Sequence, residues 1–392
     1  MNTVHRGILT LIRSALTGEK LELPCDFTLE QADKLIQKHS LLPMAYQGAY
    51  HCGIPQDSEM MQRYYARYYR VLVHCERQMD AVEKIFAAFD DNGIDFLPLK
   101  GSAIRELYPK REFRPMSDSD ILIRNQQYEK VRAVMSSLGY QEGSESDHDY
   151  TWSSEALRVE IHKCLFSDQN PDFQNYFGDG WNKLRVVRGH RYGLTQEDEY
   201  LYLFSHMMKH FLLAGIGVTH LTDLYIYRKT HPMMDEAKIE SVLKRMHLLE
   251  LYRNIRRMLL VWFEDQPEDP VSEVITDFVF SSGNFGTTFN KIYAEEALRT
   301  GCVENKRNSK EKAFFRLLFQ PLWLMRRSYK VLYKAPFLLP LFWVVRWIEV
   351  LFLRRKNIGK KMSVVRNMSD DKVEEYARIM QYMGVDLRHQ SK

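Results

Sequence analysis

The stretch from residue 91 to residue 123 constrains the fold more than any other part of the sequence. A turn signal, Asp91-Asn92-Gly93, precedes a short apolar run, Ile94–Leu99, and then Lys-Gly-Ser and the helix-like letters AIRELY. After a loop with two prolines, SDSDILIR leads acidic residues directly into a second apolar run. Strand, tight turn, helix and strand in this order predict a β-sheet in the middle of the chain, which excludes an all-helical fold.

Two further segments extend this prediction. Gln127 to Leu138 has helical spacing and closes at Gly139. Residues 156–164 alternate with period two, which predicts a strand with one buried face and one face that serves a site. The first face carries Leu157, Val159 and Ile161, and the second carries Arg158, Glu160, His162 and Cys164.

Helical periodicity dominates on both sides of these strands. Residues 1–90 and residues 197–298 repeat apolar positions at helical spacing, and 370–383 is an amphipathic helix candidate. We therefore expect an α+β fold, with a small mixed β-sheet embedded between helical N-terminal and C-terminal regions. The expected division is a helical region at 1–90, a core at 91–185, a helical domain packed on the core at 186–300, and a basic, aromatic-rich helical tail at 301–392.

Composition excludes several classes of protein. The chain has 392 residues, 45% of them hydrophobic and 27% charged, so it is neither disordered nor collagen-like. Five scattered cysteines without a C-x-x-C pair encode neither a disulfide framework nor a zinc ribbon, which favours a cytoplasmic protein. The N-terminus does not resemble a signal peptide, and the longest apolar run, residues 335–345, is shorter than the roughly 20 residues of a membrane-spanning helix. We expect no membrane-spanning segment.

Acidic residues at strand positions are the main chemical signal. Asp118 and Asp120 are two apart at the start of a strand, so their side chains share a face, and Glu160 lies in a later strand. Upstream, Gly101-Ser102 lies at a strand-to-helix turn that suits a phosphate group. One Asp-x-Asp or one Gly-Ser is more often a turn or a cap. The combination in this order indicates phosphoryl or nucleotidyl transfer with Mg²⁺.

The segment LPLKGSAIRELYPKREFRPMSDSDILI resembles the signature of the uncharacterised nucleotidyltransferase family within the polymerase-β-type superfamily. Further similarity lies in KHSLLPMAY, RVEIHKCL, HMMKH, LTDLYIY and FQPLWLMRRSYKVLYKAPFLLPLFW. The resemblance implies an enzyme, a magnesium-dependent nucleotidyltransferase that moves an NMP from an NTP, with ATP as the expected donor, to a hydroxyl or phosphate acceptor. It assigns the NTP phosphates to Gly101 and Ser102, and one or two Mg²⁺ ions to Asp118, Asp120 and Glu160.

Two residues depart from the superfamily pattern. Ser119 stands where an apolar side chain is more frequent, and Glu160 stands where Asp is commoner. These departures leave the number of metal ions open. They also support an alternative, a catalytically weak accessory protein of the same fold that binds nucleotide or a membrane surface.

Lys100 and Arg114 are the cations nearest to the acidic residues in sequence. The planar fork of an Arg side chain suits a phosphate. We expect both residues as NTP-phosphate ligands, with the alternatives that Arg114 pairs with Asp118 and that Lys100 neutralises the carboxylates.

Another group of polar residues follows on the next helices. His206 and His210 are four apart and share a helix face, which fits a metal site or, more commonly, buried or capping histidines. A third interpretation places this helix against the core, so that residues of this group line the base or acceptor pocket. The secondary pocket candidates are therefore His162, His206, Lys209, His210 and Asp223.

The tail is strongly basic. Residues 301–392 hold 20 Lys/Arg against 8 Asp/Glu, although the whole chain has a net charge of only +4. Its apolar and aromatic residues fit a helical subdomain packed on the core, which we favour. They also fit peripheral contact of 311–361 with an anionic membrane, such as the inner membrane surface, and less well the binding of nucleic acid.

Overall fold

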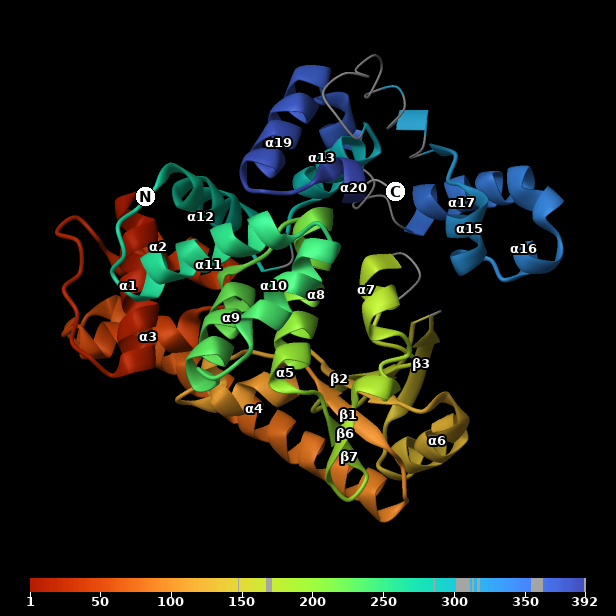
Figure 1. Cartoon of the computed structure of the whole chain (residues 1–392), viewed down its shortest axis with the longest axis horizontal. Coiled ribbons are helices and arrows are strands. Elements are labelled where there is room, and N and C mark those ends of the chain that lie inside the picture. Colours follow the sequence, from red (N-terminus) through yellow and green to blue (C-terminus); the bar gives the residue numbers. More distant parts are fainter. Residues whose placement is uncertain are drawn as a thin grey trace.

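The computed structural model describes residues 1–146, 148–166, 171–284, 286–300, 311, 314–315, 318–353 and 362–390. Helices precede and follow one sheet, as the sequence predicts (Figure 1). The helices before the sheet are α1 (Thr3–Thr17), α2 (Leu29–Lys38), α3 (Leu42–His51) and α4 (Glu59–Asp91). The α+β fold class is confirmed.

The central sheet has seven strands in the order β3-β4-β5-β2-β1-β7-β6. The strands are β1 (Phe96–Leu99), β2 (Ser119–Ile123), β3 (Gln141–Glu145), β4 (Asp149–Ser153), β5 (Arg158–His162), β6 (Arg185–Arg188) and β7 (Arg191–Gly193). Between them lie α5 (Gly101–Ile104), α6 (Tyr128–Ser137), α7 (Pro171–Phe177) and the 3₁₀ turns η1 (Arg105–Leu107), η2 (Arg111–Phe113), η3 (Asn125–Gln127) and η4 (Trp181–Lys183). The predicted strands are present, and the helix expected over AIRELY is reduced to α5 and η1.

The later helices are α8 (Gln196–Leu213), α9 (Val218–Thr230), α10 (Glu236–Arg245), α11 (Leu249–Phe263), α12 (Pro270–Ser282), α13 (Thr288–Thr300), α15 (Leu322–Ser328), α16 (Val331–Lys334), α17 (Leu339–Leu353), α19 (Asp370–Tyr382) and α20 (Leu387–Gln390), with the 3₁₀ turn η5 (Pro336–Leu338) before α17. Helices of the first and third predicted regions share one hydrophobic core. The four-part division of the chain stays a prediction.

The register of three strands determines where the site forms. β1 and β2 are antiparallel with Leu99 opposite Asp120, and β2 and β5 are parallel with Asp120 beside Glu160. Because side chains alternate along a strand, Asp118 and Asp120 point to one face of the sheet, while Ser119 and Ile121 point to the other. That second face packs on α4 and α6 in a separate core cluster.

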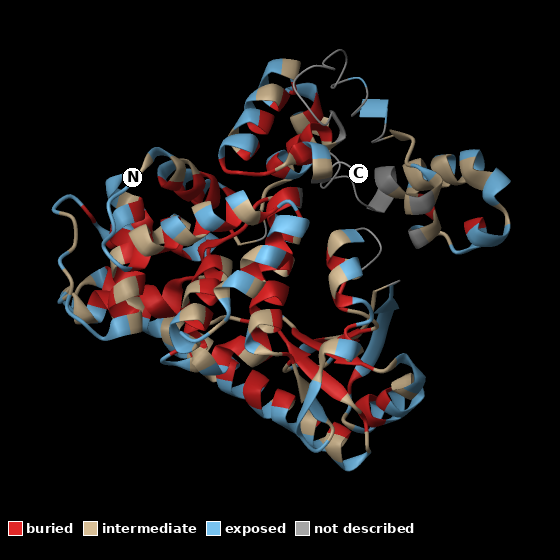
Figure 2. Ribbon diagram, viewed as in Figure 1, coloured by how far each residue is buried: buried red, intermediate tan, exposed pale blue. Residues whose placement is uncertain are grey.

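The basic tail divides into two parts. Residues 364–387 contribute side chains such as Val373, Tyr376 and Met380 to the main core, as expected (Figure 2). In contrast, no described side chain of 318–353 belongs to either core cluster, and α15, α16 and α17 project from the body of the molecule (Figure 1). For this segment the prediction of packing on the core was wrong. In the part of the chain that the structure describes, no helix has the length and apolar character needed to cross a membrane.

Ser119 provides a test of how the second face of the sheet packs on α4 and α6. Its side chain is fully buried on the α4 face of the sheet, and its Oγ has no hydrogen-bond partner within the described residues. A buried hydroxyl without a partner costs about 1–3 kcal/mol. Ser119→Ala should therefore raise the free energy of unfolding by about 1 kcal/mol in urea denaturation. Ser153→Ala, at an exposed position of β4, is the control, and a loss of stability in Ser119→Ala would contradict the assignment.

Candidate active site

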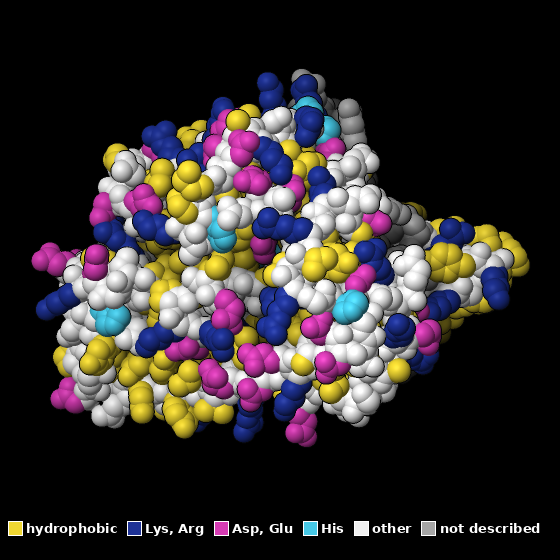
Figure 3. Space-filling model, turned by 60° about the horizontal axis from the view of Figure 1, so that its bottom comes forward, with side chains coloured by type: hydrophobic (Ala, Val, Ile, Leu, Met, Phe, Trp, Pro, Cys, Tyr) yellow, Lys and Arg dark blue, Asp and Glu magenta, His cyan; other side chains and the backbone are white. Residues whose placement is uncertain are grey.

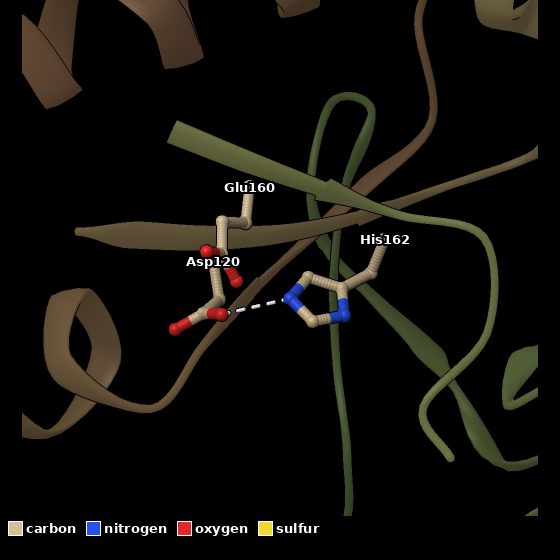
Figure 4. Close-up of side chains that lie close together, drawn as sticks. All are labelled: Asp120, Glu160 and His162. Carbon is tan, nitrogen blue, oxygen red and sulfur yellow. Dashed lines mark hydrogen bonds and ion pairs between the residues drawn. The ribbon is translucent and has the colours of Figure 1, made fainter. Parts of the chain in front are cut away.

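The carboxylate of Asp120 lies at the centre of a hydrogen-bonded cluster. Its Oδ1 accepts a hydrogen bond from Lys100 Nζ at 2.9 Å and lies 2.7 Å from His162 Nε2. One ligand atom each of Asp120, Glu160 and His162 lie within 4.8 Å of one another (Figure 4). Among the described residues, this is the one group of three or more His, Cys, Asp or Glu side chains at such spacing.

Burial and charge act in opposite directions on this cluster. Burial by itself would raise the pKa of Asp120, but the Lys100 ammonium and the hydrogen bond from His162 hold that pKa well below its ordinary value. Likewise, burial would lower the pKa of Lys100, but Asp120 raises it. Asp120 and Lys100 are therefore both charged at neutral pH.

Lys100 occupies an unusual backbone position. Its φ of 47° lies in the left-handed region, which is unfavourable for a residue with a side chain. The residue joins the end of β1 to α5, and its carbonyl accepts the first hydrogen bonds of that helical turn, from Ala103 N and Ile104 N. The strained turn holds the Lys100 ammonium against Asp120.

A cavity of about 610 Å³ opens over this cluster. Ten of the predicted site residues line it: Lys100, Gly101, Arg114, Asp118, Asp120, Glu160, His162, His206, Lys209 and His210. The structure thus brings together residues of α5, β2, β5 and α8 with residues that directly precede α5 and β2. Their individual roles stay predictions.

Asp118 lines the cavity but does not belong to the three-residue group, whose third member is His162. Its Oδ1 accepts a hydrogen bond from Ser117 Oγ at 3.2 Å. Burial and the neighbouring Asp120 raise the pKa of Asp118, and burial with both aspartates raises the pKa of Glu160. Asp120, Glu160 and His162 lie at distances that suit a divalent cation, and Asp118 lines the same cavity. A cation bound there would relieve this repulsion.

Two predicted residues do not line the cavity. Ser102 is buried, and its Oγ donates to the carbonyl of Leu99 at 3.2 Å. Asp223 is also buried and accepts hydrogen bonds from Tyr108 and, through both carboxylate oxygens, from Arg114. The alternative in which Arg114 pairs with Asp118 was wrong, because Asp223 holds its guanidinium.

Lys209 is the cavity cation without such a partner. In the described part of the chain, no hydrogen bond or ion pair joins Lys209 to another side chain, and burial and Lys100 lower its pKa. An ammonium group that faces a cavity without a counter-ion is available to an anionic ligand.

Histidines of α8 and α9 form a further part of the cavity wall. His206 and His210 lie with their Nε2 atoms 3.1 Å apart, and the rings of His210 and His220 follow at 5.8 Å. Burial lowers the pKa of His206 well below its ordinary value, that of His210 to about 4 and that of His220 to about 3. His206, His210 and His220 therefore present neutral rings at neutral pH.

The sequence interpretation missed several residues of the cavity. His148 Nε2 lies 3.1 Å from His162 Nδ1, so that His148, His162 and Asp120 form a continuous chain of contacts. Asp149 and His220 also line the cavity. His148 directly precedes β4 and Asp149 begins it, and the alternation of β4 is too weak to predict a strand there.

Comparisons with known proteins now complement this geometry. The family model described as uncharacterised nucleotidyltransferase matches residues 26–264. The chain belongs to this family. The nucleotidyltransferase is accordingly a transferase enzyme, and the matched region contains every predicted site residue.

The solved structures that match are two structures of the antibiotic-resistance factor ANT(2'')-Ia. The solution structure has 15% identity and a TM-score of 0.32, and covers 46% of this chain and 98% of its own. The crystal structure with adenylyl-2''-tobramycin has 14% identity and a TM-score of 0.31, and covers 43% of this chain and 96% of its own. Among curated proteins no match is found.

The neutral histidine wall predicts a pH dependence of stability. The folded state keeps His210 and His220 uncharged down to about pH 4, whereas the unfolded chain protonates them below about pH 6.5. The unfolded chain therefore binds more protons than the folded protein in this pH range, and the free energy of unfolding should fall as the pH drops from 6.5 towards 4. Urea denaturation at several pH values measures this slope. The double variant His210→Gln/His220→Gln should show a shallower slope, and an equal or steeper slope would contradict the assignment.

Proposed function

We propose that this nucleotidyltransferase transfers an NMP group from an NTP, with ATP as the donor and Mg²⁺ as the metal, to a hydroxyl or phosphate acceptor. The observation that supports this most strongly is the shared cavity, whose lining contains acidic residues together with Lys209 and Arg114. Carboxylates suit a divalent cation, and cationic side chains suit a triphosphate.

The reaction is an in-line displacement at the α-phosphorus. For a hydroxyl acceptor, a bond forms between the acceptor oxygen and the α-phosphorus, the bond from that phosphorus to the bridging oxygen breaks, and pyrophosphate leaves with the electron pair. Bound Mg²⁺ would supply charge neutralisation for the phosphates and the leaving group. We assign its binding to Asp118, Asp120 and Glu160, with His162 as a further donor within reach.

The other side chains position the reactants. We assign the phosphates to the Lys209 ammonium and to the backbone at Lys100-Gly101. Glycine keeps that turn open, because a side chain at Gly101 would lie within 3.3 Å of Met116 and Arg114 atoms. Both ring nitrogens of His162 are engaged, Nε2 by Asp120 and Nδ1 by His148, so we assign this ring to orienting the Asp120 carboxylate. We assign Glu160, whose carboxylate lines the cavity, to take up the proton of a hydroxyl acceptor.

Carboxylate substitution tests the assignment. Asp118→Asn and Asp120→Asn should each reduce NMP transfer at least 100-fold, because each removes negative charge that holds the metal. The measurement is the release of labelled pyrophosphate and the formation of labelled product from NTP and Mg²⁺ in cell extract. Asp80→Asn, at an exposed position of α4, is the matched control, and full transfer by both site variants would overturn the proposal.

Calorimetry distinguishes the enzyme from the alternative, a catalytically weak accessory protein of the same fold. Binding of ATP should be at least tenfold tighter with Mg²⁺ than with EDTA if the carboxylates hold the metal beside the triphosphate. Equal affinity in both conditions would favour the accessory protein.

We further propose that the projecting segment 318–353 contacts an anionic membrane surface. Phe337, Leu341, Val344 and Ile348 follow one another at helical spacing and are 45–79% exposed. Figure 3 shows hydrophobic side chains gathered on this projection, with basic side chains beside them. Lys330 and Lys334 are exposed next to the stripe, whereas the basic residues of 354–361 lie outside the described residues.

Vesicle flotation tests this contact. The full-length protein should float with vesicles that contain phosphatidylglycerol and much less with pure phosphatidylcholine. Phe337→Asp should reduce the bound fraction several-fold, because it places a negative charge in the apolar stripe. Met233→Asp, at an exposed position of another surface, is the control. Equal flotation of wild type and Phe337→Asp would exclude the contact.

A further inference from the structure

A second cavity adjoins the catalytic one. Its volume is about 480 Å³, within the range of small-molecule sites. Ser40, Pro115 and Met116 line both cavities, so the two meet at the short segment that leads from Arg114 to Asp118. The linings of the two cavities are therefore continuous with each other.

Basic side chains outnumber acidic ones in the lining of this second cavity. Arg67, Arg70 and Arg105 line it, with Glu112 as the one acidic residue among the described lining. Glu112 accepts a hydrogen bond from Tyr68 at 2.6 Å, and Arg67 pairs with Asp33 at 3.1 Å. For Arg70, which is exposed at the rim, no ion pair is present within the described residues.

Arg105 is the decisive residue, because its charge is buried without a counter-ion. Its side chain is 1% exposed, and no carboxylate of the described residues lies within ion-pair distance. Among the described residues its guanidinium donates only to neutral acceptors, namely Arg114 O at 2.9 Å, Gln78 Oε1 at 3.3 Å and Met79 Sδ at 3.5 Å. A buried cation without a counter-ion is costly in a folded protein unless something neutralises it.

Neighbouring contacts link Arg105 to the catalytic cavity. Gln78 Nε2 donates to Met116 O at 2.8 Å, and Arg105 Nε donates to Arg114 O, so both side chains hold the wall between the cavities. Arg105 also follows α5 directly, and α5 begins at Gly101 in the catalytic cavity. An anion at Arg105 is thus held beside the segment that carries Asp118.

We infer that the second cavity binds an anionic group, a phosphate or a carboxylate, of the acceptor whose hydroxyl reaches the catalytic carboxylates. The guanidinium groups of Arg105 and Arg70 bind the oxygens of this group, as planar forks do for both kinds of anion. The acceptor is therefore a small acidic molecule that also carries a hydroxyl. Its identity as the acceptor rests on the proposed function, whereas its binding as an anion does not.

Titration of the full chain with inorganic phosphate, in the absence of NTP, tests anion binding. Acetate in place of phosphate distinguishes a carboxylate from a phosphate group. We expect Arg70→Gln to weaken phosphate binding at least fivefold and Arg105→Lys to weaken it further, because Lys lacks the fork. Arg77→Gln, which removes the same charge from α4 but does not line the cavity, should change the affinity less than twofold.

The Lys209→Gln variant shows which of the two cavities binds the phosphate. Phosphate binding that depends on Lys209 and not on Arg70 belongs to the catalytic cavity and overturns the inference. Unchanged binding in Arg70→Gln overturns it as well, even if Arg105→Lys fails to fold.

Fractionation of cell extract tests the class of acceptor. With labelled ATP and Mg²⁺, product should form with the fraction that an anion-exchange resin retains. Product formed only with the unretained fraction overturns the acidic acceptor. If no fraction gives product, the proposed function fails, and the phosphate titration still decides whether the second cavity binds anions.

Discussion

The contact of Lys100 and His162 with one carboxylate oxygen of Asp120 is the interaction on which the site depends. It joins the end of β1, the start of β2 and the end of β5 at a single atom, and it compensates the cost of burying Asp120. The strained backbone of Lys100 is tolerated because this ion pair and the turn into α5 stabilise it. The antiparallel and parallel pairings of β2 are what bring the three residues together.

Much of this arrangement follows from local sequence patterns. Period-two alternation correctly predicts that Glu160 and His162 share one face of a strand and that Val159 and Ile161 enter the core. It also correctly predicts that Asp118 and Asp120 share a face. These predictions succeed because the direction of a side chain within a strand depends only on residue parity. The same parity explains Ser119, whose hydroxyl must lie in the opposite, apolar layer.

Other features depend on contacts between distant parts of the chain. Arg114 forms an ion pair with Asp223, which is 109 residues away, and no sequence pattern near either residue indicates that partner. His148 lies in the site because it directly precedes β4, a strand whose sequence lacks clear alternation. The stripe from Phe337 to Ile348 has the spacing of a packed helix face, and only its three-dimensional position reveals that it is exposed. The local sequence pattern determines the direction of a side chain, whereas tertiary packing determines which distant residue it contacts.

Helix α4 has a consequence for the choice of substrate. Over 33 residues it runs without interruption from the rim of the second cavity, where it contributes Arg67, Arg70 and Gln78, to the core beneath the sheet, where it contributes Val82, Ile85 and Phe89. The sheet that α4 supports also carries Asp120. For the acceptor inferred above, one continuous helix would set the separation between its charged end-group and the point of reaction. Such an arrangement would discriminate between acceptors by their length, in addition to their charge.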